Sequence, residues 1–138
     1  MVLVDTPVWS FSLRRRAVDL SEPERRLTQT LYRLVKEGQV QLLGPTRQEV
    51  LSGIRDESQF RRIRDHLGDF PNAAVDEHDY AEAASISNMC RRAGVSGSPV
   101  DMLMCSVSIR HDWEIFTTDN DFVQYRRVVR IRLMNPLF

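Results

Sequence analysis

Five acidic side chains lie where the backbone leaves predicted strands or enters predicted helices. Asp5 directly follows an apolar run of strand type near the N-terminus. Asp119 and Asp121 follow a second such run, in the stretch TTDNDF. Glu49 and Asp101 lie in the first turns of two predicted helices. Asp101 heads the mostly apolar segment SPVDMLMCSVSI, and an ionised carboxylate is rarely buried unless it is paired or bound to a metal.

Four or five carboxylates at one place would repel each other unless a cation lay among them. Two unit charges 4 Å apart cost about 4 kcal/mol at an effective dielectric of about 20. Mg²⁺ and Mn²⁺ prefer oxygen ligands of this kind. Such an ion can activate water and stabilise phosphoryl oxygens. The acids therefore suggest metal-assisted hydrolysis of a phosphodiester.

The hydrophobic periodicity predicts strands that alternate with helices. Strands are predicted at 2–4, 40–43, 73–75, 114–116 and 128–131. Helices are predicted at 6–14, from 21 to Gly38, from Thr46 through Ile54, at 58–67, at 79–93, from Pro99 through Asp101 onward, and at 119–125. This alternation predicts an α/β fold with a mostly parallel sheet. No linker or repeat interrupts the chain, so a single domain over residues 1–138 is expected.

The predicted sheet explains how distant acids could meet. In an open α/β sheet, ligands bind outside the carboxyl ends of the strands. At least three of the five acids should lie at that edge. Asp101 joins them if its helix points the same way.

Helix capping is the competing explanation for each acid taken alone. Ser98-x-x-Asp101 and Thr46-x-x-Glu49 both match the capping box, in which a carboxylate returns a hydrogen bond to the cap residue. The three other aspartates could cap a helix or complement its dipole. Spacing alone does not decide between capping and a shared site.

Composition limits the class of protein without identifying it. The 138 residues are 42% hydrophobic and 28% charged, typical of a soluble globular domain. No apolar run is long enough to span a membrane, and the N-terminus lacks the order of a secretory signal, so a cytoplasmic protein is expected. Two cysteines form no disulfide framework.

Several function classes lack their required residues. The histidines and cysteines show no zinc-type spacing, and no glycine pattern matches a dinucleotide or P-loop site. A haloacid-dehalogenase-type phosphatase would need a second aspartate where Pro7 stands. A response-regulator receiver would need a lysine after a late strand, but the only lysine, Lys36, lies in an early helix.

Arginine dominates the positive charge. The 19 basic residues include one lysine, and they balance 19 acids. Arginines cluster at 14–16, 61–64 and 126–127. Such clusters are either solvated surface, in a composition biased toward arginine, or contacts to nucleic-acid phosphates.

Four segments in this order resemble the PIN domain, and more closely the VapC-type toxins of toxin–antitoxin pairs. They are VLVDTPVW (2–9), TRQEVLSGIRD (46–56), SPVDMLMCSVSI (98–109) and IFTTDNDF (115–122). The resemblance runs nearly end to end and implies a three-layer sandwich around the sheet. The family's quartet of acids matches Asp5, Glu49, Asp101 and Asp119, with Asp121 as a frequent fifth acid. Thr6 and Thr118 match polar positions beside the site, whereas Pro7 departs from the small polar residue that many relatives carry.

This resemblance implies an endoribonuclease dependent on Mg²⁺ or Mn²⁺. The quartet would be catalytic, and the metal ligands would be Asp5, Asp101, Asp119 and Asp121. The expected substrate is RNA, commonly transfer or ribosomal RNA. The expected partners are a cognate antitoxin and a second copy of the chain. The alternative is a catalytically silent PIN-fold protein that binds RNA or a partner without cleaving.

Overall fold

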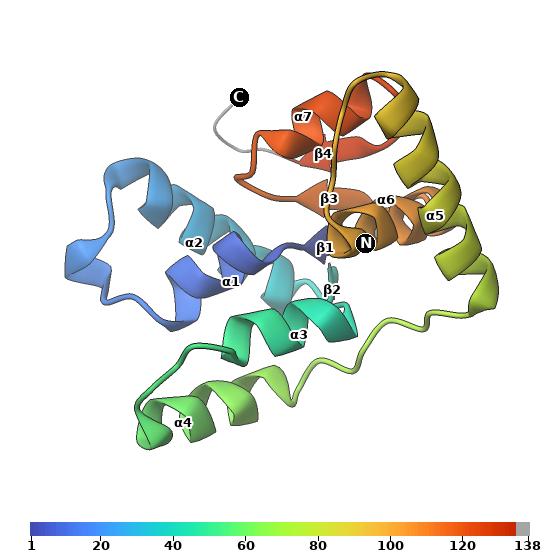
Figure 1. Cartoon of the computed structure of the whole chain (residues 1–138). Helices are drawn as coiled ribbons and strands as arrows, with labels where there is room; N and C mark the ends of the chain where they lie inside the picture. Colours follow the sequence, from blue (N-terminus) through green and yellow to red (C-terminus); the bar gives the residue numbers. More distant parts are fainter. Residues whose placement is uncertain (135–138) are drawn as a thin grey trace.

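In the described part of the chain, four short parallel strands form one sheet in the order β2-β1-β3-β4. The structure is a computed structural model that describes residues 1–134. The strands are β1 (Val2–Val4), β2 (Val40–Gln41), β3 (Glu114–Phe116) and β4 (Arg132–Met134). In Figure 1 they are stacked from β4 at the top to β2 below.

Within residues 1–134, seven α-helices and one 3-10 turn connect the strands. The helices are α1 (Thr6–Leu13), α2 (Glu22–Lys36), α3 (Gly44–Leu51), α4 (Glu57–Leu67), α5 (Glu77–Arg92), α6 (Pro99–His111) and α7 (Asp121–Arg126). The 3-10 turn, η1, covers Ala17–Asp19. Among residues 1–134, no helix has the length and hydropathy needed to cross a membrane.

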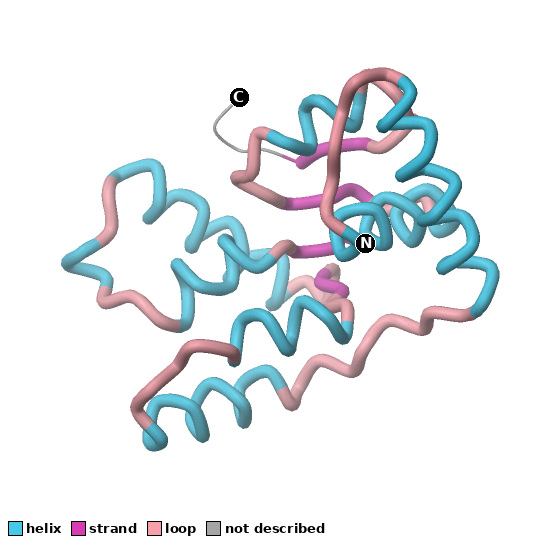
Figure 2. Tube along the Cα trace, in the orientation of Figure 1, coloured by secondary structure: helices cyan, strands magenta, loops and turns pink. Residues whose placement is uncertain are grey.

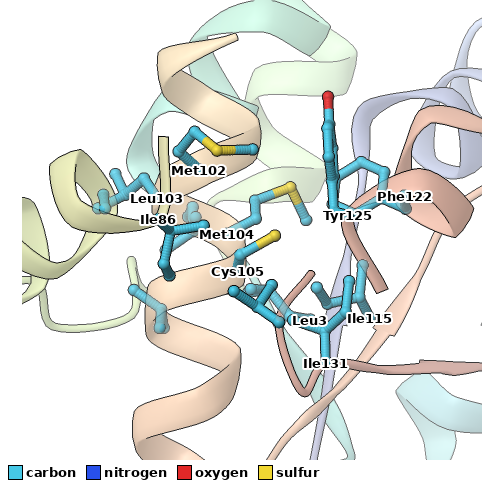
Figure 3. Close-up of a cluster of buried hydrophobic side chains, with 14 of the residues drawn as sticks. Leu3, Ile86, Met102, Leu103, Met104, Cys105, Ile115, Phe122, Tyr125 and Ile131 are labelled. Carbon is cyan, nitrogen blue, oxygen red and sulfur yellow. The ribbon is translucent and has the colours of Figure 1, made fainter. Parts of the chain in front are cut away.

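Alternate strand residues enter two separate apolar clusters. Leu3 and Ile115 pack with residues of α5, α6 and α7 on one face of the sheet, the cluster drawn in Figure 3. Val4 and Phe116 pack with residues of α1, α2, α3 and α4 on the other face. This alternation follows from the period of two in a strand. The predicted α/β fold, a three-layer sandwich around a parallel sheet, is confirmed.

The prediction that a helix begins at Thr46 is wrong. Helix α3 begins two residues earlier, at Gly44, and no side chain caps it. Pro45 lies in its first turn, where the missing N–H costs nothing and the fixed φ favours the helix. Thr46 is fully buried inside the helix, so it cannot form a capping box with Glu49.

Two predicted strands are absent at their expected positions. The loop between α4 and α5 makes a single parallel bridge, Leu42 to Asn72, in place of a strand at 73–75 (Figure 2). The apolar run 128–131 supplies buried Val129 and Ile131 to the core. The backbone of this run still belongs to the turn that follows α7, in which the Val129 N–H donates to the Tyr125 carbonyl (2.9 Å) and not to a neighbouring strand. The last strand therefore begins only at Arg132. The expectation of one domain over 1–138 stays a prediction, and residues 135–138 lie outside the described part.

Candidate metal site

Asp5 links the end of β1 to the start of α1. Its Oδ1 accepts the backbone N–H of Thr6 (2.8 Å), and its Oδ2 accepts the hydroxyl of Thr117 (2.8 Å). The side chain is buried, with 6% of the residue exposed. The capping role considered for Asp5 is thus real, but it occupies only part of the carboxylate.

Burial keeps a proton on Asp5 to a higher pH than usual. Desolvation raises the pKa of Asp5 to about 6, although the hydrogen bonds from Thr117 and Thr6 oppose the rise. The charges of Asp101 and Glu49 add to it. A buried carboxylate near two other acids is the electrostatic signature of a functional site.

Glu49 reaches the same place from α3. It lies in the second turn of that helix, not in the first turn as predicted, and it is exposed. Its Oε2 accepts the hydroxyl of Thr6 (2.9 Å). The capping explanation for Glu49 is therefore excluded by the position of the helix start.

Asp101 lies in the first turn of α6. Its backbone N–H donates to the hydroxyl of Ser98 (3.1 Å), so Ser98 caps the helix. The carboxylate of Asp101 is partly buried, and its Oδ2 accepts the hydroxyl of Tyr125 (2.7 Å). Desolvation raises the pKa of Asp101, and the charges of Asp119 and Asp121 also raise it.

Three carboxylates come close enough to share one cation. One oxygen each from Asp101, Asp119 and Asp121 lies within 4.8 Å of the others, and within residues 1–134 this is the one such group. Asp119 Oδ1 also accepts the N–H of Asp121 (2.9 Å) at the start of α7. Asp5 is not one of the three, but the charge of Asp101 contributes to the raised pKa of Asp5.

Thr117, directly after β3, connects Asp5 at the end of β1 with the backbone at Asp119. Thr117 is 4% exposed, donates to Asp5 and accepts the N–H of Asp119 (3.0 Å). The threonine predicted from the sequence as a polar neighbour of the site is Thr118, which is partly buried. Thr117 directly follows β3, and this place after a predicted strand is the sequence signal that could have identified it. In the structure it is buried like the strand residues before it.

The site therefore collects acids from four segments of the chain. They are the end of β1, helix α3, the first turn of α6 and the loop and first turn after β3. The ends of β1 and β3 lie at the same edge of the sheet, the left edge in Figure 1. The donor set consists of carboxylate oxygens, which suits a hard divalent cation.

The raised pKa of Asp5 predicts how stability depends on pH. Between about pH 4 and pH 6 the folded protein keeps a proton on Asp5 that the unfolded chain releases, so stability falls as pH rises through this window. We expect Asp5→Asn to match the parent protein near pH 4 in EDTA. At pH 8 it should be more stable by up to about 3 kcal/mol, from a shift of about two pH units. Urea unfolding at both pH values measures this. A stability difference that does not change with pH would contradict the burial of a charged Asp5.

Comparisons with known proteins agree with this arrangement. A model of the family described as PIN domain matches residues 2–128. No curated protein gives a significant match.

Three similar solved structures cover nearly the whole chain. FitAcB from Neisseria gonorrhoeae is 22% identical with a TM-score of 0.76, covering 99% of both chains. VapBC2 from Rickettsia felis, bound to a DNA fragment from its promoter, is 13% identical with a TM-score of 0.69, covering 98% of both chains. A toxin–antitoxin complex from Klebsiella pneumoniae is 20% identical with a TM-score of 0.66, covering 97% of this chain and 100% of the other. At these identities the likeness concerns the fold.

Proposed function

Since this chain belongs to the PIN domain family, we propose that it is a metal-dependent endoribonuclease and the toxin of a toxin–antitoxin pair. PIN domains are generally nucleases that use a divalent metal. The observation that carries the proposal is the convergence of five acids from four segments at one sheet edge. Caps alone would not require the acids of separate helices to face each other, because each cap needs only its own helix.

The residues present fit Mg²⁺ or Mn²⁺. Asp101, Asp119 and Asp121 offer oxygens within 4.8 Å of each other, and Asp5 adds a buried carboxylate beside Asp101. All these donors are oxygens, as both ions prefer. Desolvation raises the pKa of Asp5 and of Asp101, and the neighbouring acids add to it. A divalent cation here would offset the repulsion between these acids. These four residues are therefore our proposed ligands.

In the proposed reaction a water oxygen bonds to the phosphorus of a phosphodiester while the bond from phosphorus to one ribose oxygen breaks, and that oxygen leaves and takes up a proton. The bound metal would supply Lewis acidity to the phosphate oxygens and lower the pKa of nearby water. Glu49 is held through Oε2 by Thr6, so its Oε1 is our candidate to orient the attacking water and accept its proton. Thr117 holds Asp5 in place through Oδ2. Thr118 stays a candidate polar neighbour of the site.

Two clusters of exposed arginines support a nucleic-acid substrate. The clusters at 14–16 and 61–64 are far apart in sequence, but the Gln59 side chain donates to the Arg14 carbonyl (3.3 Å). The end of α1 and the start of α4 therefore meet. The arginines of both clusters are exposed. Not all of them are free for phosphates, since Arg15 pairs with Glu24 (3.3 Å) and Arg64 with Asp65 (3.2 Å). We propose RNA, with transfer or ribosomal RNA as the class that the resemblance favours.

The proposed partner is an antitoxin that covers the acidic site. Two of the similar structures are a VapBC2 assembly and a toxin–antitoxin complex, which supports a partner of this kind. A basic side chain of the antitoxin would complement the carboxylates. We further propose a homodimer and a cytoplasmic location, on the family resemblance. The competing function is a silent PIN-fold protein that binds without cleaving.

Manganese should stabilise the protein if the acids share a site. At about ten times the dissociation constant, one bound ion adds about 1.4 kcal/mol, which raises the Tm of a domain of this size by about 5 °C. The same ion should be required for cleavage of total RNA, and EDTA should stop it.

The matched variants separate site binding from general ion effects. Asp119→Asn should lose the shift in Tm, whereas Asp65→Asn, an exposed acid on α4, should keep it. An unchanged melting curve of the parent protein would count against a shared metal site. A shift in Tm without RNA cleavage would favour the silent binding protein.

A further inference from the structure

Tyr125 joins the apolar core to the acidic site. Its ring is 1% exposed and packs edge-on against Phe122, with 5.1 Å between the ring centroids. Figure 3 shows the hydroxyl pointing out of the apolar cluster. It donates to Oδ2 of Asp101 at 2.7 Å. The two residues come from α7 and α6, and nothing in their local sequence pairs them.

The hydrogen bond between Tyr125 and Asp101 has the geometry of a strong one. A buried phenol needs a partner, and a charged acceptor at this short distance gives a bond about twice as strong as a neutral one. Desolvation and the bond to Asp101 raise the pKa of Tyr125, so the hydroxyl stays protonated and donates throughout the physiological pH range.

Gly97 makes room for the hydroxyl. A Cβ at this position would lie 3.0 Å from Oη and Cε1 of Tyr125 and 2.5 Å from Cε of Met102. The backbone there does not have the positive φ that would itself require glycine. A side chain at position 97 would therefore have to move the Met102 methyl, the closest atom, and would also crowd the Tyr125 ring and hydroxyl.

We propose that Tyr125 is a positioning residue for the metal site. In the metal-free protein, Asp119 and Asp121 repel the carboxylate of Asp101. The Tyr125 hydroxyl holds Oδ2 against this repulsion, so that Oδ1 is directed to the cation before it binds. Partners of this type, which orient a ligand without touching the metal, typically change metal affinity about 10–100-fold. The inference rests on the proposed metal site.

The test is the Mn²⁺ affinity of Tyr125→Phe, measured by titration with electron paramagnetic resonance of the free ion. Phenylalanine keeps the ring and its packing on Phe122 and removes only the donor. We expect the dissociation constant to rise about tenfold or more. The metal concentration for half-maximal RNA cleavage should rise by a similar factor, with most of the rate restored at saturating Mn²⁺. Tyr80→Phe, a 59% exposed tyrosine on α5, is the matched control and should change neither value.

A second variant tests the same point without removing the hydroxyl. Gly97→Ala places a Cβ 2.5 Å from the Met102 methyl and 3.0 Å from the Tyr125 hydroxyl, so the methyl must move and the hydroxyl is crowded. We expect this variant also to weaken Mn²⁺ binding, by a smaller factor, so it decides the question if Tyr125→Phe does not fold in EDTA. Unchanged Mn²⁺ affinity in a folded Tyr125→Phe protein would overturn the inference and leave the proposed metal site standing. A parent protein that binds no Mn²⁺ would instead overturn the metal site itself, and the inference with it. A parent that binds Mn²⁺ without cleaving RNA, with weaker binding in Tyr125→Phe, would support the inference and remove the nuclease proposal alone.

Discussion

Replacing Glu49 by glutamine is expected to lower metal-dependent RNA cleavage about 100-fold or more, while the metal-free protein stays at least as stable as the parent. The loss follows from the proposed role of Glu49 in orienting water and accepting its proton, a contribution of about 10²–10⁴-fold. Stability should be equal or higher, because the Glu49 charge contributes to the raised pKa of Asp5.

The structure makes this substitution a clean test. Glutamine keeps the shape of the side chain, and its oxygen can still accept the Thr6 hydroxyl that now donates to Oε2 (2.9 Å). Position 49 lies in the second turn of α3, where glutamate and glutamine have similar helix propensity. No capping bond is lost, because Thr46 is inside the helix. The variant therefore removes one charge and little else.

Two measurements are made on the same preparation of the protein. Thermal unfolding in EDTA reports stability, and cleavage of total RNA with Mn²⁺ reports activity. Glu37→Gln, which alters an exposed acid paired with Arg33 at the end of α2, should leave both unchanged. Full activity of Glu49→Gln would remove Glu49 from the proposed site.

Expression of the parent chain without an antitoxin is expected to arrest bacterial growth and lower colony counts by orders of magnitude. The reason is catalytic turnover, since one enzyme molecule cleaves many RNA molecules. Expression of Glu49→Gln at the same level should permit growth. Co-expression of the cognate antitoxin with the parent chain should restore it, because a partner seated on the acids excludes substrate and metal.

The Glu49→Gln strain also distinguishes a nuclease from a silent binding protein. A protein that acts by occupying RNA or a partner keeps its surface in this variant, and growth would stop with both versions. Equal arrest by the parent chain and Glu49→Gln would therefore favour binding without cleavage. Normal growth with abundant, folded parent protein would speak against the toxin role in that host. The gene next to this one is the first place to look for the antitoxin.

Local sequence patterns determined the order of the main elements. The apolar runs at 2–4 and 114–116 are strands, and the amphipathic stretch at 58–67 lies in α4. These features depend on side chains that are neighbours along the chain. The prediction of a strand at 128–131 is wrong, because Val129 and Ile131 can be buried in the core from a turn as well as from a strand. Only the position of β3 decides which backbone N–H groups pair in the last strand.

For the candidate site, too, the sequence predicted the residues and the tertiary structure decided their contacts. Residue type and position predicted the five acids as candidates, three because they follow strands and two because they begin predicted helices, together with the sheet edge at which they should meet. The tertiary structure decided that Asp101, Asp119 and Asp121 form the closest group, and that Thr117 is the threonine that holds Asp5. The tertiary structure also brought the Tyr125 hydroxyl within hydrogen-bond distance of the Asp101 carboxylate. These contacts depend on the crossing of α6 over the sheet and on the packing of α7, which are set by the whole core. Spacing in the sequence carries no record of such distances, because side chains as far apart as Asp101 and Asp119, or Asp5 and Thr117, meet only when the layers assemble.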